Sequence, residues 1–266
     1  MQIGNLRVDS VSDGVGYFDP GAFRGTTPEM WAQHEQFLTP EGKIELAVGG
    51  FLIRGVGDRV VLVDNGIGET DPGSRFRGGK LMESLASYGL KAEDITDMVF
   101  THLHFDHIGW TTREGINQFP NATFRCDSRD WTHFVGTNER VTATMLPIQN
   151  RVETWDTGGP LLPGIDTQVA AGHTPGSTLL VLSSGTARAL LLGDVVHCPV
   201  ELLDDEWGGL GDVDPELAQR TRVALAREIE GTNTPVAAAH FPGMVFGRLL
   251  AANGKRQWVV SGGGGN

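Results

Sequence analysis

The sequence predicts an α/β fold in which short apolar strands alternate with amphipathic helices. Runs of aliphatic and β-branched residues recur along the chain, as at residues 59–64 and 178–184. Residues 214–231 instead space their apolar side chains as one face of a helix. Glycines end most of these runs. With 266 residues and an apolar fraction of 39%, the chain is long enough to bury a sizeable core.

The first half of the chain is expected to form a hairpin, a short helix and a buried strand. A turn at Gly57 and Asp58 separates the two hairpin strands. Gly89 is a natural stop for the helix that precedes it. The predicted elements are strands at residues 44–56 and 59–64, a helix at residues 81–88 and a strand at residues 97–100.

The second half of the chain is expected to contribute several strands to a sheet, with helices between them. Its clearest helix has Asp214 as N-cap, Pro215 in the first turn and Gly231 at its end. An Asn253-Gly254 turn predicts a hairpin. The predicted elements are helices at residues 127–135 and 214–231, strands at residues 178–184, 188–194 and 235–240, and a hairpin at residues 248–260. No linker divides residues 1–261, which are predicted to form a single domain with a disordered tail at residues 262–266.

Charge and hydropathy disfavour several classes of protein. The formal net charge is −12 and the 21 lysines and arginines are scattered, which argues against a nucleic-acid partner. No apolar stretch approaches the length of a membrane span, and the first residues lack the features of a signal peptide, so we expect a cytoplasmic protein without a membrane partner. Cys126 and Cys198 are expected to be reduced thiols.

The stretch THLHFDHIGW, residues 101–110, gathers three histidines and an aspartate directly after a predicted strand. On an extended segment, His102 and His104 project to the same side, so both rings can reach one metal ion. Asp106 and His107 follow where the chain leaves the strand and can face a second ion. Burying four such groups without a cation would leave costly unpaired donors and acceptors. The stretch therefore predicts a metal site.

Three downstream residues repeat the same context of a strand end beside glycine, namely His173 in AAGHTPGS, Asp194 in LLLGDVV and His240 in AAAHFPG. The predicted division is His102, His104 and His173 on one metal, Asp106, His107 and His240 on the other, and Asp194 shared by both. This donor set favours two zinc ions, although iron, manganese or cobalt would fit similar donors. His34 and His133 are expected to be ordinary surface or hydrogen-bonded residues.

THLHFDH followed by AGHTPGS, LLGD and AAHFPG resembles the metallo-β-lactamase superfamily, whose HxHxDH motif and later ligands are matched here in the same order. The resemblance runs from about residue 48 to residue 240. It implies an αββα sandwich with a site at one edge, and the intact ligand set implies a dinuclear hydrolase. Within the family, DNGIG, HFDHIGW and HFPG are most similar to the N-acyl-homoserine lactonases and the related organophosphate hydrolases.

One position departs from the lactonase pattern. Those enzymes commonly place a tyrosine three residues after the bridging aspartate, where its hydroxyl assists at the substrate carbonyl, and here that position is His197. His197 could donate a hydrogen bond to a developing oxyanion, or it could only support its neighbours. The departure fits an organophosphate hydrolase or esterase at least as well as a lactonase. Cys198 is expected to pack rather than to act as a nucleophile.

The predicted activity is hydrolysis of a small-molecule ester, most specifically a lactone, by a hydroxide that bridges two metals. Asp106 is expected to orient this hydroxide and to shuttle its proton, with His197 as a second catalytic residue. The alternatives are a phosphotriesterase or aryl esterase and, from another class, a mononuclear iron oxidoreductase acting on thiols. The oligomeric state is left open, and a homodimer is compatible with the apolar residues of the N-terminal segment.

The segments at residues 14–31 and 142–155 show too little pattern to be core strands. They are expected either to line the mouth of the site or to pack a helix against the sheet, and residues 206–214 are a candidate rim loop. The side chains expected at the mouth are Tyr17, Phe18, Phe23, Met145, Leu146 and Trp155.

Overall fold

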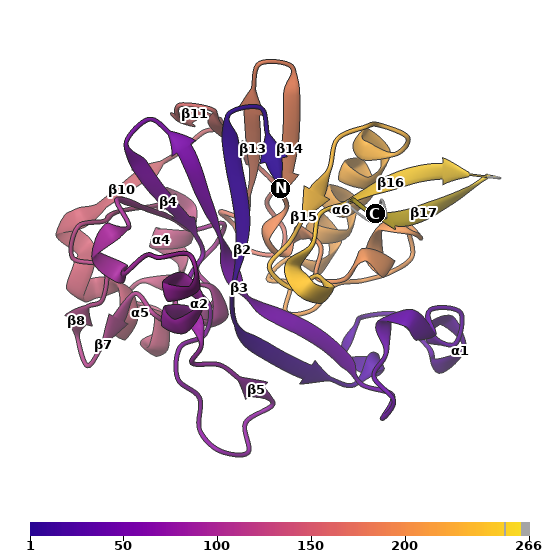
Figure 1. Cartoon of the computed structure of the whole chain (residues 1–266). Coiled ribbons are helices and arrows are strands. Elements are labelled where there is room, and N and C mark those ends of the chain that lie inside the picture. Colours follow the sequence, from indigo (N-terminus) through magenta and orange to yellow (C-terminus); the bar gives the residue numbers. More distant parts are fainter. Residues whose placement is uncertain (253, 262–266) are drawn as a thin grey trace.

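Two β-sheets pack face to face, and helices cover the outer face of each sheet (Figure 1). The computed structural model describes residues 1–252 and 254–261. In Figure 1, α2, α4 and α5 lie on one side of the molecule and α6 on the other. This arrangement confirms the predicted α/β class and the αββα sandwich.

The first sheet has the strand order β1-β2-β3-β4-β6-β9-β10, with β5 paired to β2. Neighbouring strands are antiparallel from β1 to β4, and β4, β6, β9 and β10 run parallel to one another. The strands are β1 (Gln2–Ile3), β2 (Leu6–Phe18), β3 (Ile44–Val56), β4 (Arg59–Val63), β5 (Phe76–Arg77), β6 (Asp97–Val99), β9 (Thr123–Asp127) and β10 (Val152–Trp155).

The second sheet follows chain order from β11 to β17. Its strands are antiparallel except for the parallel pair β14 and β15. They are β11 (Gly159–Leu162), β12 (Ile165–Val169), β13 (Thr178–Ser184), β14 (Ala187–Leu191), β15 (Val236–Ala237), β16 (Gly247–Ala252) and β17 (Lys255–Val260). A small separate ribbon joins β7 (Thr112–Arg113) to β8 (Ile116–Asn117).

The central strands of both sheets are apolar on both faces because these parts of each sheet are covered on both sides. In β13, Leu180 and Leu182 enter the core between the sheets, whereas Leu179 and Val181 enter the core under α6. Strand β4 alternates in the same way between the central core and the core beneath the helices of the first sheet. This two-sided burial explains why the strands read as nearly continuous apolar runs.

The helices are mostly short and cover the outer faces of the two sheets. Helix α6 begins as predicted, because the Asp214 carboxylate accepts a hydrogen bond from the Leu217 N–H at 3.0 Å and Pro215 occupies the first turn. Its apolar stripe packs on the second sheet. The helices are α1 (Pro28–Trp31), α2 (Leu81–Ser87), α3 (Phe105–Ile108), α4 (Ser128–Phe134), α5 (Glu139–Met145) and α6 (Pro215–Ile229).

Two segments predicted not to form core strands contain strands. The prediction is wrong for residues 14–18, which belong to β2, but it holds for residues 152–155, which form an edge strand. Strand β2 continues to Phe18, and its apolar alternation is broken where the register shifts between Ser12 and Gly14. Strand β10 occupies the end of residues 142–155 as an edge strand beside β9, and its side chains are exposed or half-buried. Neither segment shows the alternating pattern of a strand with one buried face.

The remaining predicted helices and strands agree with the structure apart from their ends. Strands β14 and β15 end before Asp194 and His240, which lie in the loops that follow. The hairpin β16–β17 is present, while Asn253 of its predicted turn and the predicted tail at residues 262–266 lie outside the described residues. Cys126 and Cys198 are buried and are not bonded to each other. Within residues 1–252 and 254–261, none of the helices has the length and apolar character needed to cross a bilayer.

Candidate metal centre

The seven predicted ligands come together at one edge of the sandwich. They lie in loops after strands, where backbone direction changes and side chains from different strands can converge. His102 and His104 follow β6, and the short helix α3 carries Asp106 and His107. The other three lie on the second-sheet side, with His173 between β12 and β13, Asp194 after β14 and His240 after β15.

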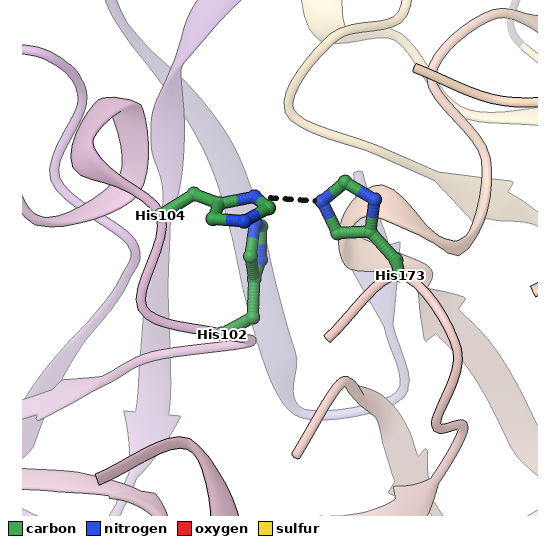
Figure 2. A group of neighbouring side chains, drawn as sticks. All are labelled: His102, His104 and His173. Carbon is green, nitrogen blue, oxygen red and sulfur yellow. Dashed lines mark hydrogen bonds between the residues drawn. The ribbon is translucent and has the colours of Figure 1, made fainter. Parts of the chain in front are cut away.

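One group of donors consists of His102, His104 and His173 (Figure 2). Figure 2 shows His102 and His104 on one segment of the chain and His173 on another, with the His173 ring facing the other two. His173 Nε2 lies 2.9 Å from His104 Nδ1, and one donor atom from each of the three side chains lies within 4.8 Å of the others. Three imidazole nitrogens that converge in this way can hold one metal ion.

A second group consists of Asp106, His107 and His240. The Nε2 atoms of His107 and His240 are 3.3 Å apart, and Asp106 Oδ2 is 3.5 Å from His240 Nε2. Asp194 lies between the two groups. Its Oδ1 is 3.2 Å from His107 Nε2, and its Oδ2 is 3.6 Å from His173 Nε2. The two groups have the same members as the two predicted triads, while His102, His107 and Asp194, and also His173, Asp194 and His197, form further convergent groups. The division of the ligands between two ions stays a prediction.

Oxygens outside the cluster fix the orientation of three rings by binding their Nδ1 atoms. A bond at Nδ1 leaves Nε2 facing the centre of the cluster, which is the orientation that metal-binding histidines require. Sequence reasoning missed these partners, although Asp64 stands in VLVDNGIG at the end of β4. The pairs are His107 with Asp64 Oδ2 at 2.9 Å, His173 with Asp212 Oδ1 at 3.0 Å, and His240 with the Ala47 carbonyl at 2.6 Å.

Burial and mutual proximity shift the pKa values of the cluster. Burial, together with the nearby His173, lowers the pKa of His104 to about 3. Burial alone would raise the pKa of Asp194, but the surrounding imidazoles hold that pKa well below its usual range. Burial alone would likewise lower the pKa of His107, yet Asp194 and Asp64 raise it above its usual value. A metal ion would compete with a proton at His107.

Two polar atoms at the centre of the cluster indicate that these residues fit metal ions. Among the described residues, His102 Nε2 and Asp194 Oδ1 are buried without a hydrogen-bond partner. Leaving such atoms unpaired costs about 1–3 kcal/mol each. A cation between the convergent nitrogens and carboxylate oxygens would satisfy both atoms. The donor set therefore fits a dinuclear metal site.

A cavity of about 490 Å³ opens onto the cluster. Phe18, from the predicted mouth, and Leu210, from the predicted rim loop, line it. The other apolar and charged lining side chains are Ala22, Leu46, Arg75, Phe76 and Phe105. None of them was named among the predicted mouth residues, although Ala22 lies in the predicted mouth segment and Phe105 lies within THLHFDHIGW.

Several side chains predicted at the mouth lie elsewhere. Met145 is fully buried in the core of the first sheet, and Trp155 packs against the core between the sheets. Phe23 is buried in a separate small core. Its ring lies edge-on to that of His197, with the two ring centroids 6.3 Å apart. Tyr17 and Leu146 are not among the residues lining the cavity. For these five the mouth alternative is wrong. Met145, Trp155 and Phe23 pack in or against cores, which is the other alternative, whereas Leu146 is exposed and Tyr17 is half-buried away from the lining.

His197 borders both the cavity and the cluster. Its ring centroid lies 4.9 Å from that of His173 and 5.8 Å from that of His240, onto which it stacks. Its Nε2 is 3.5 Å from Asp194 Oδ2. This position is compatible with either role expected for His197. His34 instead packs edge-on to Trp207, away from the cluster.

The fold and the cluster define the class as an αββα protein with a candidate dinuclear metal site at the edge of its two sheets. More specifically, the chain belongs to the metallo-beta-lactamase superfamily, since the model of that family matches residues 50–240.

Individual relatives agree with this assignment. An N-acyl homoserine lactonase of Bacillus thuringiensis is 24% identical over 197 residues, which cover 68% of this chain and 76% of the relative. AidC, described as a dizinc quorum-quenching lactonase, matches with a TM-score of 0.86 at 24% identity, over 97% of this chain and 95% of its own. A hydrolase named AbOPH matches with a TM-score of 0.86 at 25% identity and the same coverage.

Proposed function

We propose that this protein is a zinc-dependent hydrolase that opens lactones, with N-acyl-homoserine lactones as the substrate class. One observation supports this most strongly. Seven side chains with metal-ligand donor atoms converge, and five of them, His104, Asp106, His173, Asp194 and His240, line a cavity whose other walls are mostly apolar. The lactonase relatives named above support the choice of a lactone over other esters.

The proposed ligands divide into two triads and a shared carboxylate. Zinc ions bound there would supply Lewis acidity and make a nearby water acidic enough to act as a nucleophile near neutral pH. Asp194 lies close to both triads, and its carboxylate would fix the distance between them. The first triad is His102, His104 and His173, and the second is Asp106, His107 and His240.

Two residues would assist the reaction. Asp106 lines the cavity with a side chain that is 12% exposed, so its carboxylate can accept the proton of the attacking water and pass it to the leaving alkoxide. His197 also lines the cavity beside Asp194, where an imidazole N–H can donate a hydrogen bond to the oxyanion that develops on the substrate carbonyl.

Aromatic side chains would bind the acyl part of the substrate. Phe76 lies edge-on to both Phe18 and Phe105, with ring centroids 5.6 Å apart in each pair. The three rings form an apolar wall beside Asp106. Burial of an alkyl chain against such a wall stabilises the complex by about 0.8 kcal/mol per methylene. We therefore expect KM to fall as the acyl chain lengthens.

A phosphotriester is the second candidate substrate. The observation that favours it is His197, which stands where the resembling lactonases carry a tyrosine. AbOPH and AidC also match this chain with the same TM-score, so the overall fold does not discriminate between them.

Hydrolysis of several substrates by one metal-loaded preparation tests the proposal. We expect N-acyl-homoserine lactones to give a higher kcat/KM than a paraoxon-like phosphotriester or an aryl acetate. The variant His104→Ala should lose more than about 100-fold in kcat/KM because it removes a metal donor. His133→Ala, at an exposed position, is the matched control and should behave as wild type. Faster turnover of the phosphotriester would favour the second candidate.

A further inference from the structure

A buried group of charged side chains contacts His173 and His197 and is not part of the cavity lining. It consists of Asp212, Arg222 and Glu201, which we call the arginine bridge. We infer that the arginine bridge positions His173 and His197, with Asp212 orienting the first ring, Glu201 orienting the second, and Arg222 holding the two carboxylates together. The inference deepens the proposed function and rests on it.

Asp212 is placed to orient His173. Its Oδ1 accepts the hydrogen bond from His173 Nδ1 at 3.0 Å, and its side chain is only 5% exposed. The backbone beside it is tied to the same loop, because the Val213 N–H donates to the His173 carbonyl at 2.9 Å. With Nδ1 occupied in this way, the lone pair of His173 Nε2 faces the other metal donors.

Glu201 holds His197 through the backbone and faces its ring. Its Oε2 accepts hydrogen bonds from the N–H groups of His197 at 2.6 Å and Cys198 at 2.7 Å. Its Oε1 lies 3.6 Å from His197 Nδ1. The carboxylate is fully buried, so it has little freedom to turn elsewhere. Glu201 therefore sets the position of the His197 backbone and the environment of its outer nitrogen.

Arg222, from α6, joins the two carboxylates. Its side chain is 2% exposed, with Nε 3.2 Å from Glu201 Oε1 and Nη2 3.6 Å from Asp212 Oδ2. Nε also donates to the carbonyl of Val195 at 2.8 Å, directly after Asp194. A β carbon at Gly209 would lie 2.3 Å from Nη2, so the glycine leaves room for the guanidinium group.

The charges of the arginine bridge make it unlike a surface ion pair. Two buried carboxylates share one guanidinium, and each carboxylate also contacts a histidine of the candidate site. The contacts among Glu201, Arg222, Asp212 and His197 are ion pairs at 3.2–3.6 Å, and among the described residues His197 Nδ1, Glu201 Oε1 and Arg222 Nη2 make no hydrogen bond. A buried charge that loses its partner is left uncompensated. Loss of one carboxylate should therefore change the histidine it contacts more than the rest of the fold.

Zinc binding to the metal-free full-length protein tests the Asp212 half of the inference. In competition with a chromophoric chelator, Asp212→Asn should bind one of two zinc ions about 10–100-fold more weakly and leave the other unchanged. Asp205→Asn, which alters a carboxylate paired with Arg256 and Arg227, is the matched control and should match wild type. Wild-type affinity at both sites in Asp212→Asn, or equal weakening of both, would overturn the inference.

Kinetics test the Glu201 half. Glu201→Gln should bind both zinc ions as wild type does, yet lower kcat about tenfold with little change in KM, since it disturbs the oxyanion donor. An unchanged kcat would overturn this role. Arg222→Lys should show both defects together, and if it fails to fold the two isosteric variants still decide. Zinc affinities do not depend on the substrate, so a wild-type protein inactive on lactones would refute the proposed function alone.

Discussion

At the scale of single residues, buried carboxylates organise the first sheet and the loops beside the metal centre. Asp13 is an example, since its two oxygens accept hydrogen bonds from four backbone N–H groups and from the Trp110 indole. Asp97, on β6, is fully buried and paired with Arg59 and Arg125. Such carboxylates are costly to bury unless each oxygen accepts a hydrogen bond. Removing one leaves its buried partners unpaired and should lower the unfolding free energy of the protein.

The ion pairs of Asp97 lead us to expect that the unfolding free energy falls at low pH. Burial alone would raise the pKa of Asp97, but bonds from Thr96, Arg59 and Arg125 hold it below its usual value. A carboxyl whose pKa is depressed on folding stabilises the protein above the pKa of the unfolded chain, about 3.9, and loses this contribution as pH falls through the folded pKa. The difference in unfolding free energy between wild type and Asp97→Asn should therefore be largest near pH 7 and shrink below about pH 4.

Urea unfolding of both proteins between pH 3 and pH 7 measures this difference. A constant gap across the range would show that the ionised Asp97 carboxylate is not stabilised on folding. Asp166→Asn, in the second sheet and outside the ion pairs described here, is the control and should show no such trend.

At the scale of elements, the site depends on loops from two sheets being tied together. Asp130, in α4, accepts hydrogen bonds from the Leu103 N–H at 2.9 Å, the Thr174 hydroxyl at 2.9 Å and the Gly176 N–H at 2.6 Å. Leu103 lies between two predicted ligands, and Thr174 directly follows His173. One side chain of a helix thus connects the loop after β6 to the loop before β13.

Asp130→Ala should weaken this connection. It leaves two buried N–H groups without a partner and removes one of the two side-chain hydrogen bonds of the Thr174 hydroxyl, which also contacts Ser177. We therefore expect the unfolding free energy to fall by about 3 kcal/mol. Denaturant unfolding of the metal-free protein measures the loss. Asp156→Ala, at an exposed position near β10, should cost less than about 1 kcal/mol. Equal stability of the two variants would contradict the role assigned to Asp130.

At the scale of the whole molecule, much of the fold and the candidate site could be predicted from local sequence. Strands with two buried faces appear in the sequence as apolar runs. The sequence of α6 shows its N-cap residue, Asp214, and its stripe of apolar residues. The seven predicted ligands share a local context, a strand end beside glycine, which is why His173, Asp194 and His240 could be grouped with the first motif. The structure brings all seven together.

The rest could not be predicted because it depends on approach between distant segments. Asp13 lies in a stretch of β2 whose sequence has no clear apolar alternation. Its hydrogen-bond partners are far from it in sequence and contact it only in the folded chain. Asp212, Glu201 and Arg222 carry no local signal that distinguishes them from surface charges, yet α6 and two loops bury them together. The cytoplasmic location and the single-domain organisation stay predictions.

The central claim is that two metal ions held by these side chains hydrolyse a lactone. The most direct test is to add zinc stepwise to the metal-free protein and to follow ring opening of an N-acyl-homoserine lactone together with bound zinc per chain. Activity should appear with bound zinc and reach its maximum at two ions per chain. Two bound zinc ions without turnover of any lactone, or full turnover by the metal-free protein, would contradict the claim.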